Sequence, residues 1–421
     1  MSGLGGAGGA GGAGGAGGAG GAGGGNDVGG APASGGGVTY ESWLLADALI
    51  GHRDGIVGNW KGKQIEVDLN EGPALRLVED PAQLWRWEPW VRATVFDFEL
   101  LSNLHFSRSS DGKVSLWHKG GAPGGQGTGW SGQDESGKGG GQASMTRIAS
   151  MIRPPERAFI EQLGKMDEYA DLREDRASEI LYQMGPQLAF WSSIANLHPA
   201  RTPKTLELLD TVVRFAIFVE MRFKHALAVP RPIDYSPQVQ PMIQTPGHGS
   251  LPSGHGTQAY IVSNVLCALR GQPETSVFGQ QLMRQAYRVT INRTIAGVHF
   301  PVDHIAGRLL GTTLAEYFVH RCKYVPGKRG GFTPRTFNGP KFNGLLDFEP
   351  HQPLNMAELL AWCQRVPDRD PEEVRRDDFG WIEWCDTESE VEGSEILAWI
   401  WNQAAAEWDN RALATTRLPG T

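Results

Sequence analysis

Positively charged side chains and histidines that could act together on a small anion are concentrated in three short segments between residues 224 and 303. The first segment runs from Lys224 through Arg231 to Pro232. We expect Lys224 to end an apolar helix and Arg231 to lie in a stretch that prolines hold extended. A compact ammonium and a planar guanidinium fixed in this way could bind oxyanion oxygens. The alternative interpretation is that these cations only interact favourably with the dipole at the helix C-terminus and bind no ligand.

The second segment, Pro252-Ser253-Gly254-His255, lies directly before an amphipathic helical pattern. Ser253 is placed to cap this helix, and the backbone N–H groups that follow it then point out of the helix start. Such N–H groups bind anions without help from side chains. His255, at the same place, could move a proton to or from a bound group. The alternative is a capped helix with an exposed histidine.

The third segment contains Arg293, His299 and Asp303. We expect Arg293 near the end of one helix, His299 in the turn, and Asp303 at the start of the next helix. A carboxylate four positions after a histidine can accept its Nδ1–H, which fixes the tautomer and leaves Nε2 free as a ligand or nucleophile. A histidine that only satisfies an aspartate at a helix start would give the same pattern.

In this order the three segments read K-x6-R-P, P-S-G-H and R-x5-H-x3-D. They resemble the signature of the superfamily that unites type 2 phosphatidic acid phosphatases with vanadium-dependent haloperoxidases. The resemblance covers Lys224 to Asp303. Asn292 departs from it, because the family often has serine before the arginine, but the anion-binding residues are intact.

The resemblance implies a role for each motif residue. The residues that would bind the oxygens of vanadate or phosphate are Lys224, Arg231, Arg293, Ser253 and the Gly254 amide. His299 would bond covalently to the central atom as its one metal ligand, and Asp303 would orient it. His255 would act from the opposite side as an acid–base group. Several cations and donors close together are also what a multiply charged oxyanion needs when it is held away from water.

Two chemistries follow from the resemblance, because vanadate and phosphate share a tetrahedral shape. With vanadate as the cofactor, the protein would oxidise a halide with hydrogen peroxide to hypohalous acid, which reacts with a small organic acceptor. Lys224 would then polarise the bound peroxide. With a phosphomonoester, His299 would be the nucleophile, forming a phosphohistidine, and His255 would protonate the leaving alcohol. A non-catalytic relative is the third interpretation.

We favour the haloperoxidase for three reasons. The sequence has no membrane-spanning stretch, a long helical region precedes Lys224, and His248 lies seven residues before His255. Bromoperoxidases of the family carry a second histidine at that spacing, so His248 is a candidate catalytic residue and bromide is the favoured halide. The alternative for His248 is a loop histidine in a turn rich in glycine and proline.

The elements that must position these residues are mostly helices. We expect a mainly α fold, a helical bundle of the vanadium haloperoxidase and acid phosphatase type, with a small irregular or β-hairpin N-terminal part. Apolar residues at three- and four-residue spacing predict helices over 156–166, 168–183, 205–223, 256–270, 278–295, 303–322 and 394–408.

Composition divides the chain into four regions. A Gly-Gly-Ala repeat predicts a disordered tail, because it has nothing to bury. Within the next region we expect a hairpin over 64–78 and a helix or aromatic packing segment over 84–104. The regions are the tail (1–37), an N-terminal helical and irregular segment packing on the core (38–118), a Gly-rich loop (119–144) and the helical domain that carries the oxyanion site (145–421).

Charge and hydropathy restrict the partners and the location. A net charge of −8 argues against nucleic acid as a partner. The four cysteines form no CxxC pair, so we expect no thiolate metal site. With no apolar run of about 18 residues and no signal-like N-terminus, we expect a cytoplasmic protein. A homodimer is compatible with the resemblance. His225 and His304 should face away from the motif residues beside them, as packing or surface residues.

Overall fold

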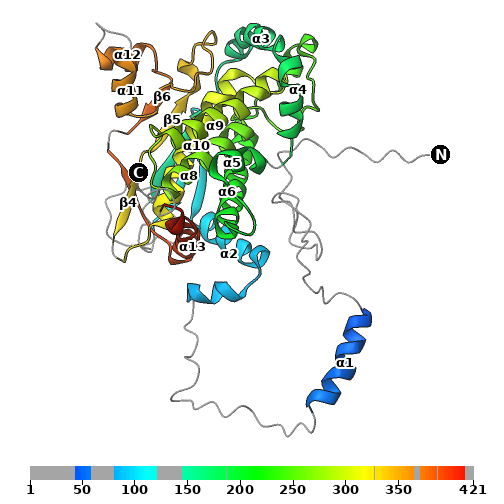
Figure 1. Ribbon diagram of the computed structural model, residues 1–421. Coiled ribbons are helices and arrows are strands. Elements are labelled where there is room, and N and C mark those ends of the chain that lie inside the picture. Colours follow the sequence, from blue (N-terminus) through cyan, green and yellow to red (C-terminus); the bar gives the residue numbers. More distant parts are fainter. Residues whose placement is uncertain are drawn as a thin grey trace, which may run out of the picture.

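The computed structural model describes residues 43–57, 80–120, 145–185, 187–326, 328–364, 370–385 and 387–412. Within these ranges the chain is mainly helical with a small sheet part, which confirms the predicted fold class (Figure 1). The tail predicted at 1–37, the hairpin predicted at 64–78 and residues 121–144 of the predicted loop lie outside the described residues.

Four long helices pack on one another at the centre of the molecule (Figure 1). Helix α10 is buried almost all the way around, as is typical of a helix in the middle of a domain. The helices predicted over 205–223, 256–270, 278–295 and 303–322 are confirmed to within a few residues. They are α6 (Pro203–Leu227), α8 (Gly254–Leu269), α9 (Val277–Ile295) and α10 (Pro301–Cys322).

Shorter helices precede and follow this central group. The helix predicted over 168–183 is instead the end of α3 and the whole of α4, because the chain turns between Ala170 and Arg173. The shorter helices are α1 (Trp43–Val57), η1 (Pro81–Arg86), α2 (Pro89–Leu101), α3 (Glu156–Ala170), α4 (Arg173–Tyr182), α5 (Leu188–Ala195), α7 (Pro232–Tyr235), η2 (Pro237–Val239), η3 (Gly339–Lys341), α11 (Met356–Cys363), α12 (Pro371–Asp377) and α13 (Glu395–Ala412).

A five-stranded sheet, in the order β1-β2-β3-β5-β6, accompanies the helices. Strands β3 and β5 are parallel, and the other neighbours are antiparallel. Strands β1 and β2 form an antiparallel hairpin at a different place from the one expected over 64–78, and the sequence patterns did not predict it. The sequence patterns did not predict β3 and the later strands, because short strands that pair across long separations leave little periodicity. The strands are β1 (Leu104–Arg108), β2 (Val114–Lys119), β3 (Met145–Ile152), β5 (Arg335–Asn338), β6 (Ile382–Trp384), and the separate pair β4 (Arg329–Phe332) and β7 (Ser389–Glu392).

Two glycines on α10 allow α8 to approach closely. A Cβ atom at Gly311 would lie 2.4 Å from the Thr257 carbonyl oxygen, and one at Gly307 would lie 2.8 Å from the Ser253 carbonyl oxygen. Neither backbone oxygen can move far inside a packed helix. This close approach brings the first turn of α8, which contains the second motif, against the start of α10, which contains the end of the third.

We therefore predict that Gly311→Ala lowers the free energy of unfolding by about 1–3 kcal/mol, because the added methyl group forces α8 and α10 apart. Gly164→Ala is the matched control, since a Cβ atom there meets nothing within 4 Å on exposed α3. That change should raise stability by about 0.5–1 kcal/mol. Urea unfolding of both variants measures the effects, and equal stabilities would contradict the role given to Gly311.

Candidate active site

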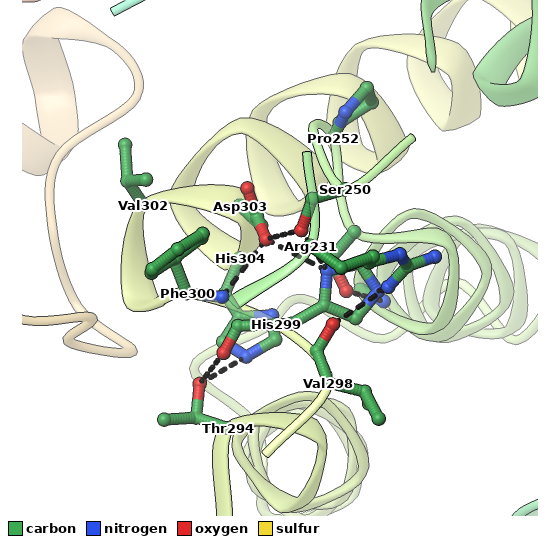
Figure 2. Close-up of polar contacts among 12 residues, drawn as sticks. Arg231, Ser250, Pro252, Thr294, Val298, His299, Phe300, Val302, Asp303 and His304 are labelled. Carbon is green, nitrogen blue, oxygen red and sulfur yellow. Dashed lines mark hydrogen bonds and ion pairs between the residues drawn. The ribbon is translucent and has the colours of Figure 1, made fainter. Parts of the chain in front are cut away.

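The three motif segments meet where α6 ends, α8 begins and α9 turns into α10 (Figure 2). Backbone hydrogen bonds join them. The Ser250 N–H donates to the Val229 carbonyl at 2.9 Å, and the Ser253 N–H donates to the Asp303 carbonyl at 2.8 Å. These bonds fix the motif segments relative to one another without the help of any ligand.

His299 is held at both ring nitrogens in one tautomer (Figure 2). Its Nδ1 lies 2.9 Å from Asp303 Oδ2, and its Nε2 lies 3.0 Å from Nη1 of Arg231. Because a guanidinium only donates, Nε2 accepts and carries no proton, so Nδ1–H donates to the carboxylate. Burial, with Arg231 next, lowers the pKa of His299 well below its ordinary value. The ring is therefore neutral, with a lone pair on Nε2.

Asp303 holds this arrangement through one of its two oxygens. Oδ2 accepts from His299, from the Ser250 hydroxyl at 2.5 Å and from the Phe300 N–H at 2.9 Å. Oδ1 is buried and has no hydrogen-bond partner in the described part of the chain. Burial raises the pKa of Asp303 to about 6, although these hydrogen bonds act in the opposite direction. The carboxylate thus fixes the imidazole but is itself only partly satisfied.

Arg231 is buried and is held mainly by backbone oxygens. Its Nε donates to the His248 carbonyl at 2.9 Å, and its Nη1 donates to the Val298 carbonyl at 2.7 Å. Its Nη2 lies 3.1 Å from Nδ1 of His248, which must therefore accept. Burial, followed by the charges of Lys224 and Arg231, lowers the pKa of His248 to about 4. His248 is thus a neutral neighbour of Arg231.

Arg293 is the least satisfied cation of the site. Its side chain is almost completely buried, and Nη2 donates to the Ile180 carbonyl and to Gln183 Oε1, both at 3.1 Å. Nε and Nη1 are buried without a partner among the described residues. Burial lowers the pKa of Arg293 to about 10, so the group stays charged at neutral pH. Two such donor nitrogens on a buried positive charge could bind an anion strongly.

Lys224 is placed differently from what the resemblance implied. Its Nζ donates to the carbonyl oxygens of Gly249 at 3.2 Å, Ser250 at 2.9 Å and Pro252 at 2.5 Å. An ammonium has three hydrogens, so these contacts occupy all of them. Burial, followed by Arg231, lowers the pKa of Lys224 to about 7. In this state Lys224 supports the loop that leads into α8, and a contact with an anion would require one of these bonds to break.

The first turn of α8 has the predicted cap. Ser253 Oγ accepts from the Gly256 N–H at 3.2 Å. A Cβ atom at Gly254 would lie 2.7 Å from Oε1 of Glu220, so any larger residue there would displace the Glu220 carboxylate. His255 Nε2 lies 2.9 Å from the Gln183 carbonyl. Since that oxygen only accepts, Nε2 carries the hydrogen and Nδ1 keeps a lone pair.

The structure brings three of the nine predicted residues to the wall of one pocket. His255, Arg293 and His299 form its polar side. Four apolar residues complete the wall and are Met184, Ile243, Pro246 and Val298. The other six predicted residues do not line the pocket. They are Lys224, Arg231, His248, Ser253, Gly254 and Asp303.

Sequence reasoning missed three buried residues of this region. Gln183, which directly follows α4, accepts a hydrogen bond from Arg293 through its amide oxygen and one from His255 through its backbone carbonyl. Ser250 lies two residues before the second motif, and its hydroxyl was a signal that could have been used. Glu220, one turn before Lys224, lies against Gly254 and has one oxygen without a partner in the described residues. Gln183 and Glu220 gave no motif signal. His304 is buried as expected of a packing residue, but its ring lies 5.7 Å from that of His299, so it does not face away from the motif residues.

Lys224, Arg231 and Arg293 form no ion pair within the described ranges, although Glu220 and Asp303 raise the pKa of Lys224 and Asp303 raises that of Arg231. Buried positive charge without an ion-paired partner is costly, so these side chains could bind an anion. The fold and site thus define a mainly helical protein in which buried cations and neutral histidines lie at or near a pocket beside the start of α8.

Comparison with known families agrees with this class. Residues 206–325 match the family model of the PAP2 superfamily, a segment that contains all three motifs. No curated protein matches the chain. Over this segment the chain is similar to the PAP2 superfamily, whose members include phosphatases and haloperoxidases. No helix in the described part of the chain has the length and apolar character needed to cross a bilayer.

The pKa of His255 gives a prediction for stability against pH. Burial, with Arg293 next, lowers this pKa from 6.5 to about 3. Between these values the unfolded chain binds a proton that the folded protein does not, so stability falls as the pH falls. His255→Asn should reduce this slope by about 1.4 kcal/mol per pH unit between about pH 6 and 4. Denaturant unfolding in phosphate-free buffers measures it, and identical slopes would exclude a neutral, buried His255.

Proposed function

We propose that the pocket binds vanadate and that the protein is a vanadate-dependent haloperoxidase, which oxidises a halide with hydrogen peroxide to hypohalous acid. The observation that carries the proposal is the pairing of unlike groups in one pocket. Arg293 has two buried nitrogens, Nε and Nη1, without a partner among the described residues, and His299 offers a neutral Nε2. The first suits the oxygens of the anion and the second suits its central atom.

The residues present fit this cofactor. Arg293 and Arg231 would bind its oxygens, together with N–H groups at the start of α8, and His299 would ligate vanadium through Nε2. Vanadate, when bound, supplies a Lewis acid that activates hydrogen peroxide. Asp303 keeps the proton on Nδ1 of His299, so that Nε2 remains a ligand. His255 has a lone pair on Nδ1 and can accept a proton at the pocket wall.

Bromide is the halide that we propose. The support for it is His248, which the resemblance relates to bromoperoxidases and which lies 3.1 Å from a nitrogen of Arg231. This contact connects the second histidine to the anion-binding cations, although His248 does not line the pocket itself. It would act on the site by holding the Arg231 guanidinium in place.

Phosphomonoester hydrolysis is the second candidate, and the apolar part of the pocket favours it. An ester has an organic group beside its phosphate, and Met184, Ile243 and Pro246 provide a surface for such a group. His299 Nε2 would attack phosphorus, and the ester oxygen would leave with a proton from His255. The low pKa of His255 in the free protein would rise beside a bound dianion, which makes this proton available.

Two assays on one preparation distinguish the reactions. We expect protein loaded with orthovanadate to brominate a dye when peroxide and bromide are added. A phosphatase would instead hydrolyse an aryl phosphate, and vanadate would inhibit it. His299→Ala should abolish retention of vanadate in dialysis, because the covalent ligand is lost. Absence of both activities would favour the non-catalytic alternative.

Arg293→Ala should lower the turnover rate by about 10²–10³, the usual effect of removing one preorganised donor. Arg288→Ala is the matched control on the same helix, because its half-exposed guanidinium pairs with Glu179 at 2.7 Å and does not line the pocket. Steady-state rates of both variants test the assignment. Full activity of Arg293→Ala would show that Arg293 on α9 is not part of the active site.

A further inference from the structure

The pocket has two chemically different sides. His255, Arg293 and His299 form the polar side, and Met184, Ile243, Pro246 and Val298 form the other. The apolar residues bring no charged group and no strong hydrogen-bonding side chain to the pocket. A bare inorganic anion needs only the first side, so the second side requires its own explanation.

The apolar side belongs to a packed cluster. Ile180, Ile295, Ala296 and Val298 are buried together beside the pocket, and Ile243 packs against them. This cluster is separate from the main core of the protein. A wall supported in this way keeps its shape, whereas apolar side chains on a free loop would not.

Hydrogen bonds hold the loop that carries Ile243. The Met242 N–H donates to the Ala296 carbonyl at 3.0 Å. Arg173, at the start of α4, donates to the carbonyls of Val239 at 2.8 Å, Gln240 at 3.0 Å and Ile295 at 2.9 Å. One guanidinium therefore joins α4, this loop and the end of α9.

Helix α4 is also fixed at its other end, next to the pocket. Gln183 follows the helix and accepts from Arg293 through its amide and from His255 through its carbonyl. Met184 is the next residue and lines the pocket. The residue that adds apolar surface is thus positioned by the same contacts that position the anion-binding groups.

We infer that this side of the pocket is a subsite for an uncharged, apolar organic group, aromatic or branched alkyl, held directly beside the anion. Met184 and Ile243 are its specificity-determining residues. The space around these residues, about 280 Å³, includes open solvent, so a group attached to the anion can extend outward along this wall. The inference rests on the proposed oxyanion site but not on the reaction, since the group is an acceptor for a haloperoxidase and an ester group for a phosphatase.

Binding of phosphonates tests the subsite without turnover, because their C–P bond is not hydrolysed. Calorimetry would compare inorganic phosphate, methylphosphonate, phenylphosphonate and 2-aminoethylphosphonate at a pH where each phosphonate group is a dianion. We expect phenylphosphonate to bind at least about tenfold more tightly than methylphosphonate, since the ring gains apolar contact. The charged aminoethyl compound should bind no more tightly than methylphosphonate.

Variants then locate the effect. Met184→Gln and Ile243→Thr should each reduce the ratio of the phenylphosphonate and methylphosphonate affinities to about threefold or less, because each puts a polar group on the apolar wall. The readout is the ratio of the two affinities, so a change that weakens the binding of both phosphonates equally leaves it unchanged. Leu181→Gln is the control on exposed α4 surface and should keep the ratio of the unmodified protein.

The outcomes separate the two proposals. If inorganic phosphate and the phosphonates all fail to bind, the oxyanion site itself is wrong, and the subsite falls with it. If phosphate binds but phenylphosphonate and methylphosphonate bind equally, the oxyanion site stands and the apolar subsite is overturned. If both variants keep the unmodified ratio, the ring binds elsewhere and the assignment of Met184 and Ile243 is overturned.

Discussion

The site depends on Arg293, a buried guanidinium that forms no ion pair among the described residues. The surrounding structure keeps this side chain away from solvent. Helix α9 carries it into the interior, and the Ile180 carbonyl and the Gln183 amide satisfy one of its nitrogens. Both partners are neutral, so the positive charge persists and the remaining N–H groups face no acceptor among the described residues. Under the proposed function, the free energy gained on binding an anion would come from this unsatisfied state.

The second requirement is a lone pair at a fixed position beside that charge. Asp303 supplies it indirectly, since it takes the Nδ1 proton of His299 and thereby keeps Nε2 free. Arg231 occupies Nε2 in this structure, so a ligand must displace one hydrogen bond before it reaches the ring. The geometry depends in turn on Gly307 and Gly311, because the close approach of α8 and α10 sets the distance between the second and third motifs.

The fold was predictable where signals are local. Apolar periodicity, together with Ser253 as a predicted cap, was sufficient for the central helices, whose bounds agree with the patterns to within a few residues. The sheet was not predictable in the same way. Strands β3 and β5 are far apart in the sequence, with all four long helices between them, and nothing within either strand indicates its partner.

The sequence by itself determined the chemistry that was available at the site. The spacing of His299 and Asp303 predicted their hydrogen bond, and Ser253 was predicted as a cap, because each interaction spans one helical turn. Only the tertiary structure decided which groups face the pocket. In the folded chain Lys224 donates to three backbone carbonyl oxygens, and Gln183 accepts a hydrogen bond from Arg293. Such contacts join residues far apart in the chain, and their geometry comes from packing, which no local pattern records.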